Sequence, residues 1–445
     1  MLIMVVSWML ISGDGFALSR FVFLGAIYAW PLLIALALMG AVGRGGWLGY
    51  IAIYGVIVTL TAGVTIAVNE AFTVIQAIYL WLFANLVPSV LFLGVLHPRI
   101  RAMGPLILTI SMAGSVSSFG LFAMASNSET VLRIMTRLSI ALGLGTEGVF
   151  VLMLLLPFLA GALMSVLLLR VIGYWYRIKR VSAHSMTLGC LWLLFAVWQP
   201  ITFAFENIAM ALVGPISFVA YLGLYQLGCG LWTTPPNSKP RSIFLLRVFA
   251  LETASRDLFA LWSTSWLRLG SIAMISGPDL ATTAVEPNEF LAFIGGRLDR
   301  EFIGNHEQIK RRLDGYDDQP DADGNFRTND FFCHTHTWRP VVQQLTTRAD
   351  GVLMDLREFR SGNDGCAWEL GQLLERVALD KVVLITNKKT DHAHLLQTLN
   401  TCWQSVSAES PNVSGAQAVV RVLPVSSLNA TTARRLVQAT MGSHS

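Results

Sequence analysis

"ADGVLMDLREFRSGNDGCAWELGQLL", residues 349–374, predicts a strand, a loop and a helix in direct succession. Residues 351–356 are a short apolar run of the kind found in buried strands. Residues 357–365 are rich in Ser, Asn, Asp and Gly, which favour a loop. Leucines then recur at helical spacing from residue 366 onward. A strand followed closely by a helix is the repeating unit of a parallel sheet.

Similar apolar runs occur on both sides of this stretch, and helical patterns separate them. We expect strands at 242–250, 271–276, 351–356, 381–387 and 418–425. We expect helices at 253–268, 287–304, 337–347, 366–378, 391–405 and 428–441. Short apolar strands that alternate with helices indicate a parallel sheet covered on both faces. Five such strands suit a flavodoxin-like, doubly wound domain with the strand order 2-1-3-4-5.

In a doubly wound sheet, ligands bind where the winding direction reverses, at the carboxyl ends of strands one and three. This rule selects residues 250–257 and 357–369. With Asp364 as the N-cap of the helix, Glu369 lies at the edge of its buried face. Glu369 is then either a boundary residue favoured slightly by the helix dipole or a carboxylate that faces a cleft.

Composition separates this polar half from a very apolar one. The chain has 445 residues, of which 54% are hydrophobic and only 13% are charged, too apolar for an ordinary soluble protein. Residues 1–240 contain 11 Lys and Arg and 5 Asp and Glu, against 21 and 23 in the remainder. Neither half has the basic surface of a nucleic-acid-binding protein. The five scattered cysteines fit a reducing compartment for the polar half.

The apolar half predicts a seven-span membrane domain over residues 1–232. The spans are expected at 21–43, 47–68, 72–96, 104–125, 148–169, 186–204 and 209–231. Each is close to the ~20 residues needed to cross a bilayer, and none contains Asp, Glu, Lys, Arg or His. Residues 1–12 are too short to span and favour an interfacial or re-entrant segment. Residues 233–241 are a linker, and 242–445 form the α/β domain.

Basic residues in the short loops decide the predicted orientation. The odd-numbered loops and the segment after the last span carry Arg44, Arg99, Arg101, Arg170, Arg177, Lys179, Arg180, Lys239 and Arg241. The opposite side carries Arg20, Arg133 and Arg137, diluted by Asp14, Glu70, Glu129, Glu147 and Glu206. The positive-inside rule then places the N-terminus outside and the α/β domain in the cytoplasm. Residues 129–145 predict an amphipathic helix in the outer interface.

The stretch 349–374 resembles the third strand and following helix of a TIR domain. Ala349–Asp350, Ser361 and Cys366-x-x-Glu369-Leu370 match that family, whereas Gly365 stands where it has Trp. The polar half also resembles a group of uncharacterised bacterial multi-pass membrane proteins, through "GSIAMISGPDL", "EPNEFL" and "FFC" followed by "TW". This resemblance implies a bacterial inner membrane protein with a cytoplasmic TIR-like domain that self-associates.

In enzymatic TIR domains the matching glutamate takes part in NAD cleavage, so the resemblance implies Glu369 as the catalytic residue. A carboxylate suits this role because cleavage of an N-glycosidic bond develops positive charge in the transition state. NAD would be a substrate and not a permanently bound cofactor. The candidate binding residues in the two loops are Leu251, Glu252, Arg357, Ser361, Asn363 and Cys366.

We assign no metal site. "CHTH" at 333–336 offers three potential ligands without a second cluster, whereas zinc needs about four.

Three hypotheses remain. The first is a membrane-tethered sensor or effector with a TIR-like signalling domain that hydrolyses NAD. The second is a non-catalytic, membrane-anchored interaction module. The third is a transporter with an appended domain, against which the absence of ionisable groups within the spans counts.

The predicted orientation is tested by a topology reporter fused after Ser445. The basic odd loops predict that an enzyme active only outside the cytoplasm gives no signal at this position, whereas a cytoplasmic fluorescent reporter does. The matched control carries both reporters in the loop after the first span, beside Arg44. A signal from the external reporter at Ser445 would show that the number of crossings is even.

Overall fold

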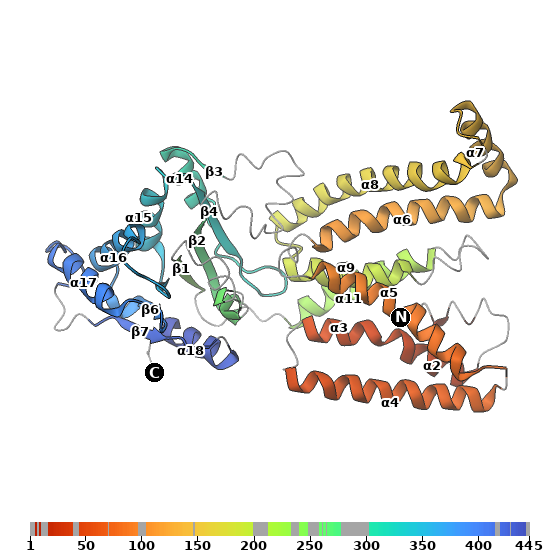
Figure 1. Cartoon of the computed structure of the whole chain (residues 1–445), viewed down its shortest axis with the longest axis horizontal. Helices are drawn as coiled ribbons and strands as arrows, with labels where there is room; N and C mark the ends of the chain where they lie inside the picture. Colours follow the sequence, from red (N-terminus) through yellow and green to blue (C-terminus); the bar gives the residue numbers. More distant parts are fainter. Residues whose placement is uncertain are drawn as a thin grey trace. The chain divides into compact units, whose positions relative to one another are not determined.

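The computed structural model of the chain describes residues 5–6, 9, 17–38, 44–69, 71–96, 104–145, 147–198, 212–232, 240–247, 258–259, 261–263, 265–276, 302–413, 419–427 and 429–441. Its contacts divide the chain into two compact units, one up to Trp232 and the other beginning at Thr233. The first unit is helical and the second is an α/β unit (Figure 1). Most of residues 1–12 and of the linker 233–241 lie outside the described residues.

Nine labelled helices form the described part of the first unit. They are α2 (Leu18–Tyr28), α3 (Trp30–Leu38), α4 (Arg44–Val68), α5 (Val74–Val95), α6 (Gly104–Asn127), α7 (Glu129–Ala141), α8 (Gly148–Arg177), α9 (Ala183–Trp198) and α11 (Val213–Trp232). Among the described residues, five helical segments are long and apolar enough to cross a membrane: 18–38, 46–68, 74–95, 104–125 and 148–177. These five confirm a membrane-type helical unit.

The sixth and seventh predicted spans correspond to shorter apolar helices. Within the described residues these are α9, with 16 residues, and α11, with 20 residues, which is close to the ~20 needed for a crossing. Seven full-length spans therefore stay a prediction for these two. The predicted spans ran into residues 199–211, which lie outside the described part of the chain.

A proline separates α2 from α3. Pro31 has no N–H group, so it cannot bond the carbonyl of Ile27 one turn earlier. Asn85 Nδ2 of α5 donates to that carbonyl at 3.0 Å, and the Tyr54 hydroxyl of α4 donates to it at 3.3 Å. Trp81 Nε1 donates in turn to the Tyr54 hydroxyl at 2.9 Å. Side chains from two other helices thus satisfy the carbonyl that the proline frees, as an apolar surrounding requires.

Helices α6 and α8 pack closely because small residues face each other. A methyl group added at Gly161 of α8 would overlap Ser117 Oγ and the Ala113 carbonyl of α6. One added at Gly114 would lie 2.8 Å from the ring of Phe158. Small residues one turn apart let helix backbones approach in a membrane, where van der Waals packing holds helices together.

The second unit contains one parallel sheet of seven strands. They are β1 (Arg241–Arg247), β2 (Gly270–Ser276), β3 (Phe302–Ile303), β4 (Thr328–Cys333), β5 (Gly351–Asp355), β6 (Val382–Thr386) and β7 (Arg421–Pro424). Their spatial order is β3-β4-β2-β1-β5-β6-β7. The five predicted strands correspond to β1, β2, β5, β6 and β7, and their mutual order is the one predicted.

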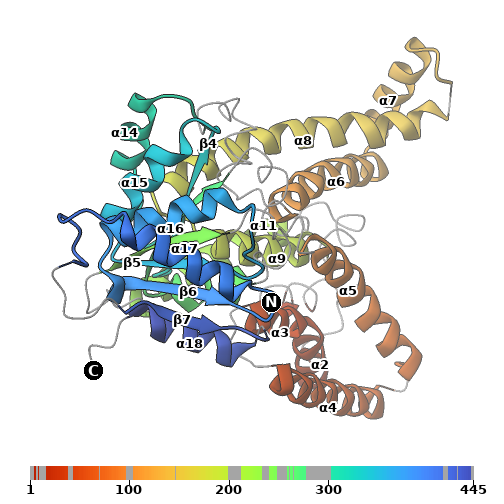
Figure 2. The same ribbon diagram turned by 60° about the vertical axis from the view of Figure 1, so that its left-hand side comes forward.

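Helices cover both faces of this sheet (Figures 1 and 2). The helices are α14 (His306–Asp314), α15 (Trp338–Arg348), α16 (Asp364–Arg376), α17 (His392–Gln404) and α18 (Ala430–Met441), with a 3₁₀ turn η3 at Leu379–Lys381. One core lies under α15 and α16, and another lies under α18 and the helical residues around Trp262 and Trp266. The predicted burial of residues 352–354 and 382–384 is confirmed, and these two runs pair in parallel.

The segment between β2 and β5 differs from the prediction. We expected a helix at 287–304 and no strand before 351. Instead, Phe302 and Ile303 form β3, followed by α14 and by β4, which pairs with β2. Residues 287–300 lie outside the described part. The run "TNDFFC" of β4 is apolar only in its second half, so its pattern did not predict a buried strand.

Asp350 fixes the register between β1 and β5. Its carboxylate Oδ2 accepts the backbone N–H of Ser242 at 2.9 Å, and its own N–H donates to the Ser242 carbonyl at 2.8 Å. Both bonds lie at the amino ends of neighbouring strands. Asp350, the second residue of the Ala349–Asp350 pair, therefore connects β1 to β5 at their amino ends, opposite the carboxyl edge of the sheet.

The α6–α8 contact gives a test of the helical unit. Gly161→Leu should push the two helices apart and lower stability by on the order of 2 kcal/mol, because overpacking forces backbone shifts. Thermal unfolding of the purified protein in detergent measures the effect. Gly120→Leu is the control, because a methyl group at Gly120 of α6 meets nothing within 4 Å. Equal melting temperatures for both variants would contradict the close packing.

Candidate functional site

The carboxyl ends of β1 and β5 lie side by side at the point where the winding reverses. From β1 the chain continues to β2 on one side of the sheet, and from β5 it continues to β6 on the other. The last paired residue of β5, Asp355, lies between Arg247 of β1 and Ile385 of β6. Such a switch point is where open α/β sheets bind ligands.

A buried ion pair occupies this position. Arg357 Nε donates to Asp355 Oδ1 at 2.8 Å, and Arg357 Nη2 donates to Asp355 Oδ2 at 2.7 Å. Asp355 is only 1% exposed and Arg357 only 5% exposed. A bidentate arrangement holds a guanidinium and a carboxylate in one fixed geometry. Removing either partner would leave a buried charge unpaired, which costs about 3–5 kcal/mol.

The loop that follows Arg357 is held in a strained conformation. Glu358 has φ +65°, a value that only glycine adopts easily. Three contacts tie this loop to the one after β6: Thr390 Oγ1 donates to the Leu356 carbonyl at 3.0 Å, the Asp391 N–H donates to the Phe359 carbonyl at 2.9 Å, and Lys389 pairs with Glu358 at 2.7 Å. The loops after β5 and β6 are therefore connected to each other at the carboxyl edge.

Glu369 lies inside the protein, below this edge. It is 2% exposed, and its Oε2 atom has no hydrogen-bond partner among the described residues. Burial raises the pKa of Glu369 to about 8. The carboxyl group is therefore mostly protonated at neutral pH, because an ionised carboxylate without a partner is costly in an apolar surrounding.

The predicted edge position of Glu369 is wrong, and α15 explains why. Trp368 packs edge-on against Trp338 of α15, with ring centroids 5.0 Å apart. Gln343 Nε2 of α15 donates to Gln372 Oε1 at 3.0 Å. These contacts cover the flank of α16 on which Glu369 lies by helical phase. The buried arc of α16 is thus wider than its leucine stripe predicts.

Cys366, one turn before Glu369, is part of the apolar core under α16. Burial raises the pKa of the Cys366 thiol, and the nearby charges of Glu369 and Asp355 raise it further. The thiol therefore stays protonated, which makes it a packing residue and a poor nucleophile.

The other predicted site residues have different surroundings. Asn363, and not Asp364, is the N-cap residue of α16, and its Oδ1 accepts the Arg360 N–H at 2.9 Å. Because the Asn363 side chain accepts this hydrogen bond within the turn, the helix begins one residue earlier than predicted.

Ser361 is exposed in the loop. Leu251 and Glu252, with the rest of 250–257, lie outside the described residues, so the predicted cleft between the two loops does too.

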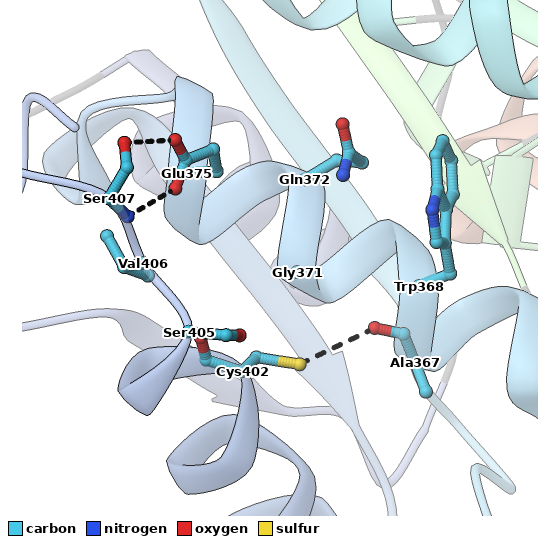
Figure 3. A pocket seen from close by; sticks show the side chains of 9 residues that line it. All are labelled: Ala367, Trp368, Gly371, Gln372, Glu375, Cys402, Ser405, Val406 and Ser407. Atoms are coloured by element: carbon cyan, nitrogen blue, oxygen red, sulfur yellow. Dashed lines mark hydrogen bonds between the residues drawn. The ribbon is translucent and has the colours of Figure 1, made fainter. Parts of the chain in front are cut away.

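A pocket opens along α16, between this helix and α17, and Trp368 and Gln372 are among its lining residues (Figure 3). Its volume is about 360 Å³. Cys402 Sγ of α17 donates to the Ala367 carbonyl at 3.7 Å, and Ser407 N and Oγ donate to Glu375 at 2.9 and 2.5 Å. Gly371 lies between these two links and leaves the space open. Glu369 does not line this pocket.

Sequence analysis missed two polar residues near the carboxyl edge. Asp355 was included in a strand, although an acidic residue inside a fully buried run with Arg two positions later signals a buried pair. Thr386 ends β6, is buried, and leaves its Oγ1 atom without a partner among the described residues. By strand alternation its side chain lies on the same face as Leu384, the face that α16 covers.

No model of a protein family matches the chain, and no curated protein or solved structure is significantly similar to it. In the described ranges, no three His, Cys, Asp or Glu side chains lie close enough to hold a metal ion.

The buried carboxyl group predicts a pH-dependent local stability. The pKa of Glu369 is raised in the folded protein from 4.5 to about 8, so the folded state binds more protons than the unfolded state between these values. Stability should therefore fall as pH rises through this window, by about 5 kcal/mol in total. Hydrogen-exchange protection of the β5 and α16 amides, corrected for intrinsic rates, measures it.

Glu369→Gln should remove this dependence, because the amide does not titrate. Glu375→Gln, on the solvent side of the same helix, should retain it. An equal pH slope in the wild type and Glu369→Gln would show that the buried carboxyl group does not cause it.

Proposed function

We propose that the chain is a membrane-tethered signalling protein whose TIR-like α/β unit acts in the cytoplasm by self-association. The strand order β2-β1-β5-β6-β7, followed at the switch point by the helix that carries Cys366-x-x-Glu369, is the observation that supports the TIR-like assignment most. The apolar helical unit supports the tether. The basic odd loops support an outside N-terminus and a bacterial inner membrane location.

The surroundings of Glu369 favour association without catalysis in the conformation described. Stabilising the positive charge of NAD cleavage needs an ionised carboxylate in contact with the ribose. Glu369 is instead buried and has a pKa of about 8. Near pH 7 only about one molecule in ten carries the charge. A TIR-like module that signals by docking to other copies needs no such charge.

NAD hydrolysis is the second candidate, and one observation favours it. A buried carboxyl atom without a partner is costly, and such groups concentrate at functional sites. The strained backbone at Glu358 lies at the same edge of the sheet. For catalysis α16 would have to move away from α15, so that Glu369 becomes exposed and ionised. Association of the cytoplasmic units would supply the energy for that change.

The function is tested with the full-length protein in lipid vesicles at increasing protein density. We expect cross-linking between cytoplasmic units to rise with density, and Glu369→Gln to leave it unchanged, because a buried carboxamide preserves shape and hydrogen-bonding capacity. NAD consumption is followed in the same samples. A protein that stays monomeric at every density would overturn the association proposal.

The NAD measurement separates the two candidates. If the clustered wild type consumes NAD, Glu369→Gln and Glu369→Ala should abolish the activity, whereas Glu375→Gln should retain it. NAD turnover that persists in Glu369→Gln would remove this residue from the mechanism. Absence of turnover in the clustered wild type leaves the non-catalytic association module as the function.

A further inference from the structure

Helix α7 stands at one end of the hairpin formed by α6 and α8 (Figures 1 and 2). Only Ser128 separates it from α6, and a short turn leads from it into α8. Both partners are long and apolar enough to cross a membrane. If α6 and α8 span the bilayer, α7 therefore lies at its surface, on the side that the loop charges assign to the outside.

One side of α7 is apolar. Val131, Ile134, Met135 and Leu138 follow helical spacing, and Ile134 is 53% exposed, whereas the other three are partly buried. Beyond the helix, Leu142 and Leu144 are also about half exposed. This surface continues onto α8, where Phe150 is 69% exposed. Bilayer lipid covers the exposed side of α8, so the same lipid is the natural cover for α7.

The polar side of α7 carries two arginines, one turn apart. Arg133 pairs with Glu129 at 2.9 Å, but both side chains are largely exposed, so this pair contributes little. Arg137 is exposed and makes no ion pair within the described part of the chain. Guanidinium groups bind phosphate oxygens with two parallel hydrogen bonds. Helices that bind anionic lipid place an apolar face at the acyl boundary and basic side chains at the level of the headgroups. The residues of α7 fit this description.

Hydrogen bonds close the carboxyl end of α7. Leu144 N donates to the Ser139 carbonyl and Gly143 N donates to the Ile140 carbonyl, both at 3.0 Å, a Schellman closure with Gly143 at φ +70°. Ser139, which is fully buried, donates from Oγ to the Gly145 carbonyl. The Gly148 N–H of α8 donates to the Leu144 carbonyl at 3.2 Å, so the turn that ends α7 is hydrogen-bonded to the first residue of α8.

We propose that α7 is a lipid-sensing surface that gathers anionic phospholipid headgroups through Arg133 and Arg137. The lipid contact itself depends only on membrane insertion. Its role as the signal rests on the proposed function, because a sensor needs an output. The experiment below detects lipid at α7 and does not depend on association of the cytoplasmic units. Failure of the lipid contact can therefore be distinguished from failure of the proposed function.

The test uses the full-length protein in nanodiscs of equimolar phosphatidylglycerol and phosphatidylcholine. A fluorescent amino acid replaces Ile134, and either lipid is supplied in brominated form to quench it. Brominated phosphatidylglycerol should quench more, with local enrichment of about fivefold for each arginine. The same probe at Leu163, a lipid-exposed position on α8, is the control and should be quenched equally by both lipids.

Two double variants identify the cause. Arg133→Gln with Arg137→Gln should equalise the quenching by the two lipids at position 134. Arg133→Lys with Arg137→Lys should keep most of the difference, because the charge is retained. Equal quenching by both lipids in the otherwise wild-type protein would overturn the anionic preference. Quenching at position 163 but not at 134 would show that α7 is not in the interface at all.

Discussion

The pairing of β1 with β5 is the constraint on which the α/β unit depends. These strands are distant in the chain, and Asp350 locks their register through two hydrogen bonds to Ser242. With β5 beside β1, β2 and β4 extend the sheet on one side and β6 and β7 on the other. The reversal then brings Asp355 and the helix carrying Glu369 to the same edge.

The sequence predicted the fold well where apolar patterns were strong. The runs that became β5 and β6 are buried along their full length, so composition alone identified them. β3 and β4 were missed for a different reason. β3 has two residues, and β4 begins with the polar residues Thr328, Asn329 and Asp330 near the edge of the sheet. Among the described residues, β3 pairs only with Phe332 and Cys333, so the polar residues of β4 have a strand neighbour on one side only and need not be apolar.

The structural environment of the predicted site residue Glu369 differs from the one expected from the sequence. A resemblance over a few residues selected Glu369, and helical phase placed it at a boundary. Its burial depends on α15, a neighbour whose position follows from the whole sheet and not from the local pattern. The same limit applies to Arg357, whose ligand-binding role was predicted from its loop, whereas Asp355 already holds its guanidinium group. Local sequence identifies chemical groups, and tertiary contacts decide whether they are available.

The break between α2 and α3 has a consequence for biogenesis. The carbonyl that Pro31 frees belongs to Ile27, but its donors are on α4 and α5, and Asn85 is 58 residues further along the chain. During synthesis this carbonyl therefore lacks its side-chain donors until α4 and α5 have been made. The hydrogen bonding at the break between α2 and α3 is complete only after these later helices have packed against it.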